Sequence, residues 1–187
     1  MNKNYYYVVS TLPVLRLGKK APLEKDDFMK LCSLHLAKDD LDILHTAALH
    51  GVAANAGGPG VLNEWYRWNE KLSQTLASLR KERISLKRAV SGDYAREPAY
   101  SPIAHIAGSA FREASPLMAD EILTKARWDF LTHLEFGHYF DIERLLIYLL
   151  KLLILQRNAS FNKDRGETLV MHIIDIQCAG LSINPAK

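Results

Sequence analysis

One uninterrupted helical segment constrains this chain of 187 residues more than any other feature of its sequence. Neither glycine nor proline occurs between Val61 and Ser91, and large apolar side chains recur there at helical spacing. The resulting apolar stripe of one helix comprises Trp65, Trp68, Leu72, Leu76, Leu79, Leu86 and Val90. A helix of this length extends roughly 45 Å, which is longer than a compact domain of this size needs. We therefore expect part of it to project from the body or to pack against a partner.

The other periodic segments also predict helices. Acidic residues precede two amphipathic segments near the N-terminus, Ser115-Pro116 opens a third, and Asp141 caps a segment that is apolar nearly all round. Such an all-round apolar helix is typical of the centre of a core. In addition to the long helix at 61–91, the expected helices lie at about 28–35, 41–48, 115–137, 142–157 and 164–180.

These segments predict an all-α fold, a bundle of about six helices in a single domain over 1–187. The Gly-rich loop at 51–60, with Gly57-Gly58-Pro59-Gly60, also allows a division into lobes 1–56 and 61–187. The block from Tyr5 to Leu17 mixes β-branched and aromatic residues, and periodicity cannot decide there between a short extended segment and a helical turn.

Composition and cysteine usage favour a cytoplasmic globular protein. Hydrophobic residues make up 48% of the chain and charged residues 24%, which excludes a mainly disordered chain. Cys32 and Cys178 are too few and too far apart for a structural zinc site, and we expect two reduced, buried thiols. The most apolar segment, 145–155, falls short of the roughly 20 residues of a membrane span.

The sequence contains no recognisable catalytic motif, and we expect neither an enzyme nor a cofactor. Gly57-Gly58-Pro59-Gly60 lacks the Gly-Lys-Ser/Thr ending of a P-loop and the third glycine of a dinucleotide loop. Gly108-Ser109 lacks the frame of a nucleophile elbow.

One alternative is a helical metalloenzyme of the di-iron carboxylate type. Glu135-x-x-His138 has the spacing that such bundles use, and Asp42-x-x-His45 is a partial second copy. That chemistry needs further inward-facing glutamates on two other helices, and Gly137 interrupts the first motif. Polar residues at a helix end explain the spacing better than a metal site does.

The net charge of +3 comes from one part of the chain. Residues 61–100 carry +3, whereas the flanking stretches carry +1 and −1. The basic side chains concentrated on the long helix are Arg80, Lys81, Arg83, Lys87 and Arg88. Three interpretations are open: a solvated helix face, a docking surface for an acidic protein partner, or a nucleic-acid-binding surface.

Several segments taken together carry a family resemblance. They are Tyr5-Tyr6-Tyr7-Val8-Val9-Ser10-Thr11-Leu12-Pro13, Phe28-x-x-x-Cys32, Trp68-Asn69-Glu70-Lys71-Leu72, Leu79-Arg80, Ala119-Asp120-Glu121, Arg127-Trp128, Phe140-Asp141-Ile142-Glu143, Tyr148, Lys151-Leu152 and Gln156-Arg157. In this order the chain resembles an uncharacterised bacterial family encoded in operons of V-type (A/V-type) ATPases. That family is thought to be similar to the C subunit, the helical adaptor between the central stalk and the membrane rotor ring.

The resemblance implies a non-catalytic, protein-binding role in ion transport. The expected partners are central-stalk or rotor-ring subunits, and the expected location is the cytoplasmic side of the membrane, through the ATPase complex. Neither a nucleic acid nor a membrane span belongs to this prediction. The adaptor of these ATPases is itself considerably longer and consists of three related helical units, of which this chain would cover a part.

Overall fold

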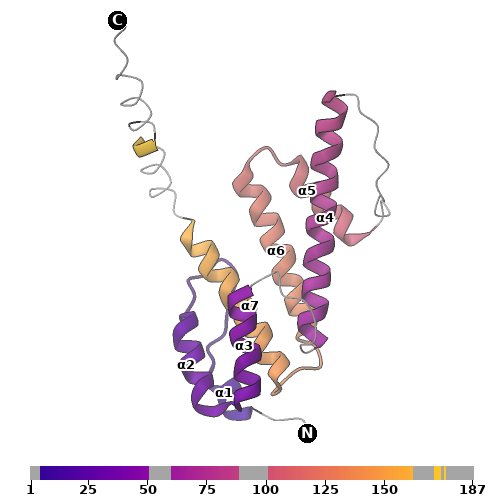
Figure 1. The fold of residues 1–187 in the computed structure, drawn as a ribbon. Coiled ribbons are helices and arrows are strands. Elements are labelled where there is room, and N and C mark those ends of the chain that lie inside the picture. Colours follow the sequence, from indigo (N-terminus) through magenta and orange to yellow (C-terminus); the bar gives the residue numbers. More distant parts are fainter. Residues whose placement is uncertain (1–4, 51–59, 89–100, 162–170, 174, 176–187) are drawn as a thin grey trace, which may run out of the picture.

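The computed structural model describes residues 5–50, 60–88, 101–161, 171–173 and 175. The main helices within these ranges are α1 (Tyr6–Thr11), α2 (Lys25–His35), α3 (Lys38–His50), α4 (Gly60–Arg88), α5 (Pro102–Arg112), α6 (Pro116–Leu134) and α7 (Ile142–Ser160). No strand occurs in these described ranges, so the expected all-α fold is confirmed (Figure 1).

The helix boundaries agree well with those expected from periodicity. The long helix begins at Gly60, and the acidic pairs Asp26/Asp27 and Asp39/Asp40 lie in the first turns of α2 and α3. The N-terminal block is helical at α1 rather than extended, which resolves the alternative that the sequence left open. Most of the helix expected at 164–180 lies outside the described residues.

Helix α5 is absent from the helices expected from periodicity. Ser101 is its N-cap, and the Ser101 hydroxyl accepts a hydrogen bond from the Ala104 amide at 3.0 Å. Pro102 follows in the first turn, where its missing N–H costs no helical hydrogen bond. The Ser-Pro pair is the same start signal that correctly predicts α6, so the signal is present at both places.

Two hydrophobic clusters form the interior. The larger one surrounds α7, whose residues 145–152 are all buried, as expected for a central core helix. This cluster also includes side chains of α1, α2 and α3, of the first turns of α4 and of the end of α6. The smaller cluster lies between the second half of α4, α5 and the start of α6, around Leu72, Leu76 and Ala107. The larger cluster contains residues from both sides of the Gly-rich loop, and the proposed division into lobes stays a prediction.

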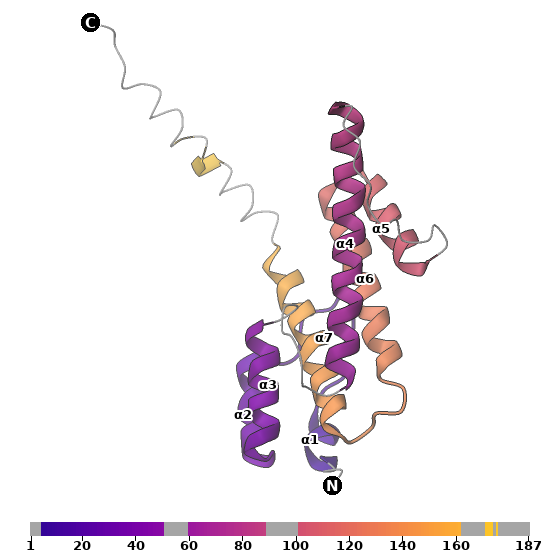
Figure 2. The same ribbon diagram turned by 45° about the vertical axis from the view of Figure 1, so that its right-hand side comes forward.

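Helix α4 belongs to both clusters. Trp65 packs in the larger cluster, Leu72 and Leu76 in the smaller one, and Trp68 packs against both. The C-terminal turns of α4 extend beyond α5 and α6 (Figure 2), so part of the long helix projects as its length predicted. Among the described helices, none is long and apolar enough to cross a membrane.

Burial makes the larger cluster sensitive to alkaline pH. It raises the pKa of Cys32 from 9.0 to about 12 and that of Tyr148 from 10.0 to about 12. Both groups hold their protons more tightly in the folded state. The contribution of these two groups to the free energy of unfolding is therefore complete below pH 9 and is lost as the pH rises towards 12.

We accordingly expect Cys32 and Tyr148 to lower the midpoint of urea unfolding between pH 9 and pH 12, against the opposite effect of Lys151, whose lowered pKa stabilises the fold as the pH rises towards 10.5. Unfolding curves followed by circular dichroism across this range would measure the decrease. Cys32→Ala should make the midpoint depend less on pH near pH 9, because it removes the thiol that begins to titrate there. The same pH dependence of the midpoint in the wild type and in Cys32→Ala would contradict this expectation.

Candidate functional site

A groove on the smaller cluster brings apolar and basic side chains together on the described surface. It has a volume of about 380 Å³ and lies between α4, α5 and α6. Leu76 and Ile84 of α4, Phe111 of α5 and Leu123 of α6 supply most of its apolar lining. The Ile84 side chain remains 57% exposed, which is unusual for a large aliphatic residue. The groove therefore offers apolar surface that the described fold does not cover.

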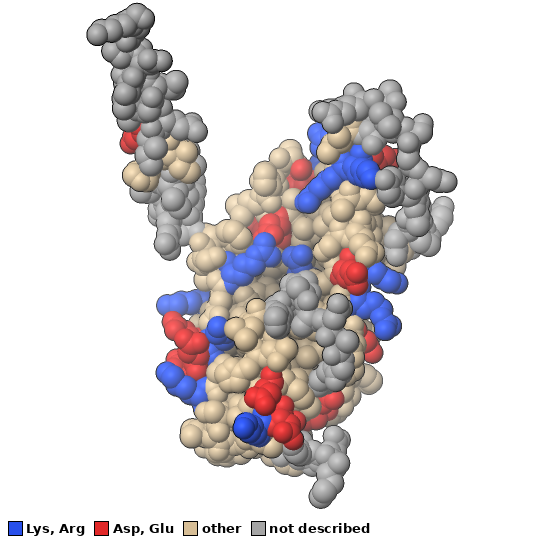
Figure 3. Space-filling model, viewed as in Figure 1, with Lys and Arg blue, Asp and Glu red and all other residues tan. Residues whose placement is uncertain are grey.

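Two arginines of α4 complete the lining of this groove. The Arg83 guanidinium lies 5.7 Å from the centre of the Phe111 ring, in a cation–π contact. Arg80 lines the groove one turn earlier, and both side chains are exposed. Basic side chains gather on this end of α4 in the space-filling view (Figure 3), so the apolar floor has a positively charged edge.

The basic run predicted from the sequence thus coincides in part with this groove. Arg80, Lys81 and Arg83 are exposed on α4, and two of them line the groove. Lys87 and Arg88 belong to the last turn of α4, but their side chains lie outside the described residues. The Gly-rich loop also lies outside them, apart from Gly60, which begins α4.

The metal site considered from the sequence is not assembled as its spacing suggested. Helix α6 ends at Leu134 and Gly137 has a φ of +90°, so Glu135 and His138 do not share a continuous helix. The Glu135 carboxylate instead accepts a hydrogen bond from Lys151 at 2.8 Å and forms an ion pair with Arg144 at 2.9 Å. Asp42 and His45 lie on α3. The only candidate metal group in the described part of the chain contains His138 but none of the other three.

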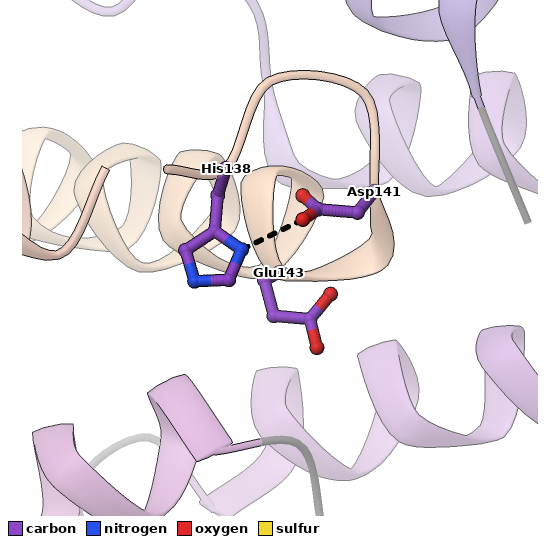
Figure 4. A group of neighbouring side chains, drawn as sticks. All are labelled: His138, Asp141 and Glu143. Carbon is purple, nitrogen blue, oxygen red and sulfur yellow. Dashed lines mark hydrogen bonds and ion pairs between the residues drawn. The ribbon is translucent and has the colours of Figure 1, made fainter. Parts of the chain in front are cut away.

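That group consists of His138, Asp141 and Glu143 at the start of α7 (Figure 4). His138 Nδ1 lies 2.7 Å from Asp141 Oδ2, and Asp141 Oδ1 accepts a hydrogen bond from the Arg144 amide at 3.1 Å. Asp141 is the N-cap of α7, and Glu143 lies in the first turn, where the helix dipole favours negative charge. The arrangement is fully explained as a helix cap.

A partly buried ion pair between Glu135 and Lys151 connects the end of α6 to α7. The Lys151 side chain is only 8% exposed, and its ammonium group lies 5.0 Å from the Trp128 ring centre. Desolvation lowers the pKa of Lys151, and the hydrogen bond and charge of Glu135 oppose that decrease. The pair is therefore a structural connection between the two helices.

A further polar connection links α4 to α6. The buried Asn69 accepts a hydrogen bond from Arg127 Nε at 3.1 Å and donates one to the Trp65 carbonyl oxygen at 3.1 Å. Arg157 of α7 donates to Asp120 of α6 at 2.8 Å. Asn69, Asp120, Arg127, Lys151 and Arg157 come from the segments that carry the family resemblance, and their contacts here hold helices together.

The apolar half of the groove does not follow from the sequence pattern. Phe111 lies on the unexpected helix α5, and Leu123 lies on the predicted helix at 115–137, for which the sequence named no partner. The Ser101-Pro102 start signal would have placed α5, but no local pattern places α5 against α4. The groove depends on contacts between segments that are distant in the sequence.

Comparisons with known proteins give one match. The model of a family described as a protein of unknown function (DUF2764) matches residues 108–180. No curated protein matches the chain. The solved structures likewise contain no match. The matched range covers the end of α5 and all of α6 and α7.

Proposed function

We propose that this protein is a non-catalytic, protein-binding component of a V-type ATPase, an accessory protein or a stalk adaptor similar to the C subunit, which couples or assembles the rotary complex. The observation that carries the binding role is the groove between α4, α5 and α6, with its exposed apolar lining and its two arginines. An interface needs apolar surface at its centre and polar groups at its rim, and this groove offers both.

The polar clusters of the described fold favour binding over catalysis. Glu135 is paired with Lys151 and Arg144, and His138 with Asp141 caps a helix. Each of these titratable groups thus has a structural partner. The charged groups that line the groove are instead the exposed Arg80 and Arg83, and arginine is enriched at protein interfaces.

The ATPase as the partner is supported by the sequence resemblance to a family encoded in V-type ATPase operons. The fold is compatible with an adaptor, because α4 is a continuous helix of 29 residues that two hydrophobic clusters hold. Central-stalk or rotor-ring subunits are the expected partners, and the docking residues are Arg80, Lys81, Arg83, Lys87 and Arg88.

Charge reversal of these five residues to glutamate should abolish co-purification of the protein with ATPase subunits from native membranes. Electrostatic complementarity guides such association, and five reversals replace attraction to an acidic partner by repulsion. The measurement is an affinity pull-down of the tagged chain of 187 residues, followed by identification of the bound subunits.

A matched control reverses five exposed cations of the N-terminal part, namely Arg16, Lys19, Lys20, Lys30 and Lys38. This variant carries the same change in net charge and should co-purify like the wild type. Circular dichroism establishes that both variants fold. Undiminished co-purification of the α4 variant would refute the assignment of this surface, and absence of ATPase subunits from the wild-type sample would refute the proposed partner.

A further inference from the structure

We infer that the groove between α4, α5 and α6 receives an acidic amphipathic helix of a partner protein. The apolar stripe of that helix lies on the groove floor, and its carboxylates pair with Arg80 and Arg83. This docking mode rests on the binding role proposed for the groove and adds the chemistry of the partner segment.

The helical walls of the groove favour a helix as the occupant. The α4 side chains of the lining lie within 76–84 at intervals of four, three and one, so they share one face of that helix. On the opposite wall, Ala119 and Leu123 of α6 are four positions apart. The backbone groups of helices are already paired internally, so these walls offer no edge to an extended peptide. Rows of side chains at helical spacing instead accept the side-chain ridge of another helix.

The groove floor is apolar surface that a fourth helix would cover. Ile84 is 57% exposed, and Phe111 and Leu123 are only half-buried. Removing such side chains from water is favourable, in proportion to the apolar area that becomes buried. Ala110 and Ala119 also line the groove, and their small side chains allow a close approach of the partner backbone.

The charge of the groove selects an acidic helix. Arg80 and Arg83 are its charged lining residues, and neither forms an ion pair within the described part of the chain. The cation–π contact with Phe111 uses the face of the Arg83 guanidinium, whereas its N–H groups point outward in the guanidinium plane. The two arginines are three positions apart on α4, so two carboxylates one turn apart on a partner helix can pair with both.

Two other occupants match the groove less well. The α4 helix of a second copy would bring its own Arg80, Lys81 and Arg83 against the same residues, and like charges would repel. A nucleic acid would pair its phosphates with the arginines, but phosphate contacts make no use of the exposed Ile84. An acidic amphipathic helix is complementary to both the charged and the apolar lining.

Two synthetic peptides test this docking mode on the isolated chain of 187 residues. Each peptide has about 18 residues, or five helical turns, and carries the same leucine stripe at helical spacing. Glutamate flanks the stripe in one peptide and lysine in the other, and a hydrocarbon staple on the far face keeps both helical. Fluorescence anisotropy of the labelled peptides measures binding. We expect the glutamate peptide to bind at least about tenfold more tightly than the lysine peptide.

Charge reversal on the groove should invert this preference. Arg80→Glu with Arg83→Glu should bind the lysine peptide more tightly than the glutamate peptide, because the groove edge becomes acidic. The matched control is Arg67→Glu with Lys71→Glu, which changes the net charge equally at exposed positions of α4 outside the groove lining. This control should keep the preference for the glutamate peptide.

A neutral substitution tests the apolar contact separately. Ile84→Ser should weaken binding of the glutamate peptide about tenfold, because the leucine stripe loses an apolar neighbour. Ala77→Ser, at an exposed position of the same helix outside the groove lining, should bind like the wild type. Unchanged affinity in Ile84→Ser would show attraction by charge alone, as a nucleic acid would also give, and would overturn the docking mode.

The remaining outcomes separate this docking mode from the ATPase association. No binding of the glutamate peptide, or equal affinity for both peptides, would overturn the docking mode even if ATPase subunits co-purify with the protein. A dimer in analytical ultracentrifugation that Ile84→Ser abolishes would assign the groove to a second copy and would also overturn it. Binding of the glutamate peptide by a protein that recovers no ATPase subunit would support the docking mode and refute the proposed partner.

Discussion

Glu135→Gln is expected to lower the free energy of unfolding by about 3 kcal/mol, because it leaves a buried charge without its counter-ion. The Glu135 carboxylate lies 2.8 Å from the Lys151 ammonium, and the Lys151 side chain is only 8% exposed. Glutamine keeps the size of the side chain but removes its charge. Urea unfolding curves at neutral pH measure the change.

Two further variants identify the cause. Adding Lys151→Met to Glu135→Gln removes the uncompensated charge and should recover most of the lost stability. Asp120→Asn breaks the ion pair with Arg157, whose side chain is 50% exposed, and should cost at most about 1 kcal/mol. A Glu135→Gln variant no less stable than Asp120→Asn would contradict the structural role of the pair.

The pH dependence of the loss provides a second check. Burial lowers the pKa of Lys151 below its ordinary value of 10.5, so the unfolded chain binds this proton more tightly than the folded one. The Lys151 contribution to stability therefore improves as the pH rises from the lowered pKa towards 10.5. Without the carboxylate this pKa should fall further, and the gap between Glu135→Gln and wild type should narrow at alkaline pH.

Asn69→Leu is expected to lower the free energy of unfolding by about 2–3 kcal/mol, because leucine cannot accept the hydrogen bond from Arg127. Asn69 is completely buried, and burial also lowers the pKa of the Arg127 guanidinium. Removing the acceptor leaves a partly buried cation with one hydrogen bond fewer.

A double-mutant cycle with Arg127→Met measures this coupling. The double variant should be clearly more stable than the sum of the two single losses predicts, since the orphaned donor is absent. Additive losses would show that Asn69 contributes through packing alone. Unfolding followed by circular dichroism and by tryptophan fluorescence gives the four stabilities.

The sequence predicted local structure well because local structure depends on spacing. The stripe from Trp65 to Leu79 defines α4, and the uninterrupted apolar character of 145–150 places α7 at the centre of the larger cluster. The carboxylate of Asp141 as the cap of α7 also follows from its position before an apolar run.

The pairing of helices did not follow from spacing. Glu135 and His138 share an interval that suggests common ligation, yet a turn separates them and directs Glu135 to Lys151, 16 positions further on. The groove requires α5 beside α4, although residues 89–101 separate these helices. Arg80 and Arg83 were predicted as docking residues from charge alone, whereas their apolar neighbours Phe111 and Leu123 depend on the tertiary arrangement.

The sharing of α4 between two hydrophobic clusters has a mechanical consequence. The helix is held at two places along its length, by the larger cluster around Trp65 and by the smaller cluster around Leu72 and Leu76. Two separated packing contacts resist tilting of α4 more than a single contact at its base would, so a sideways force on the projecting end should tilt the helix less. Loosening one support, as Asn69→Leu would do between them, should make the free end swing more widely without changing the helix itself.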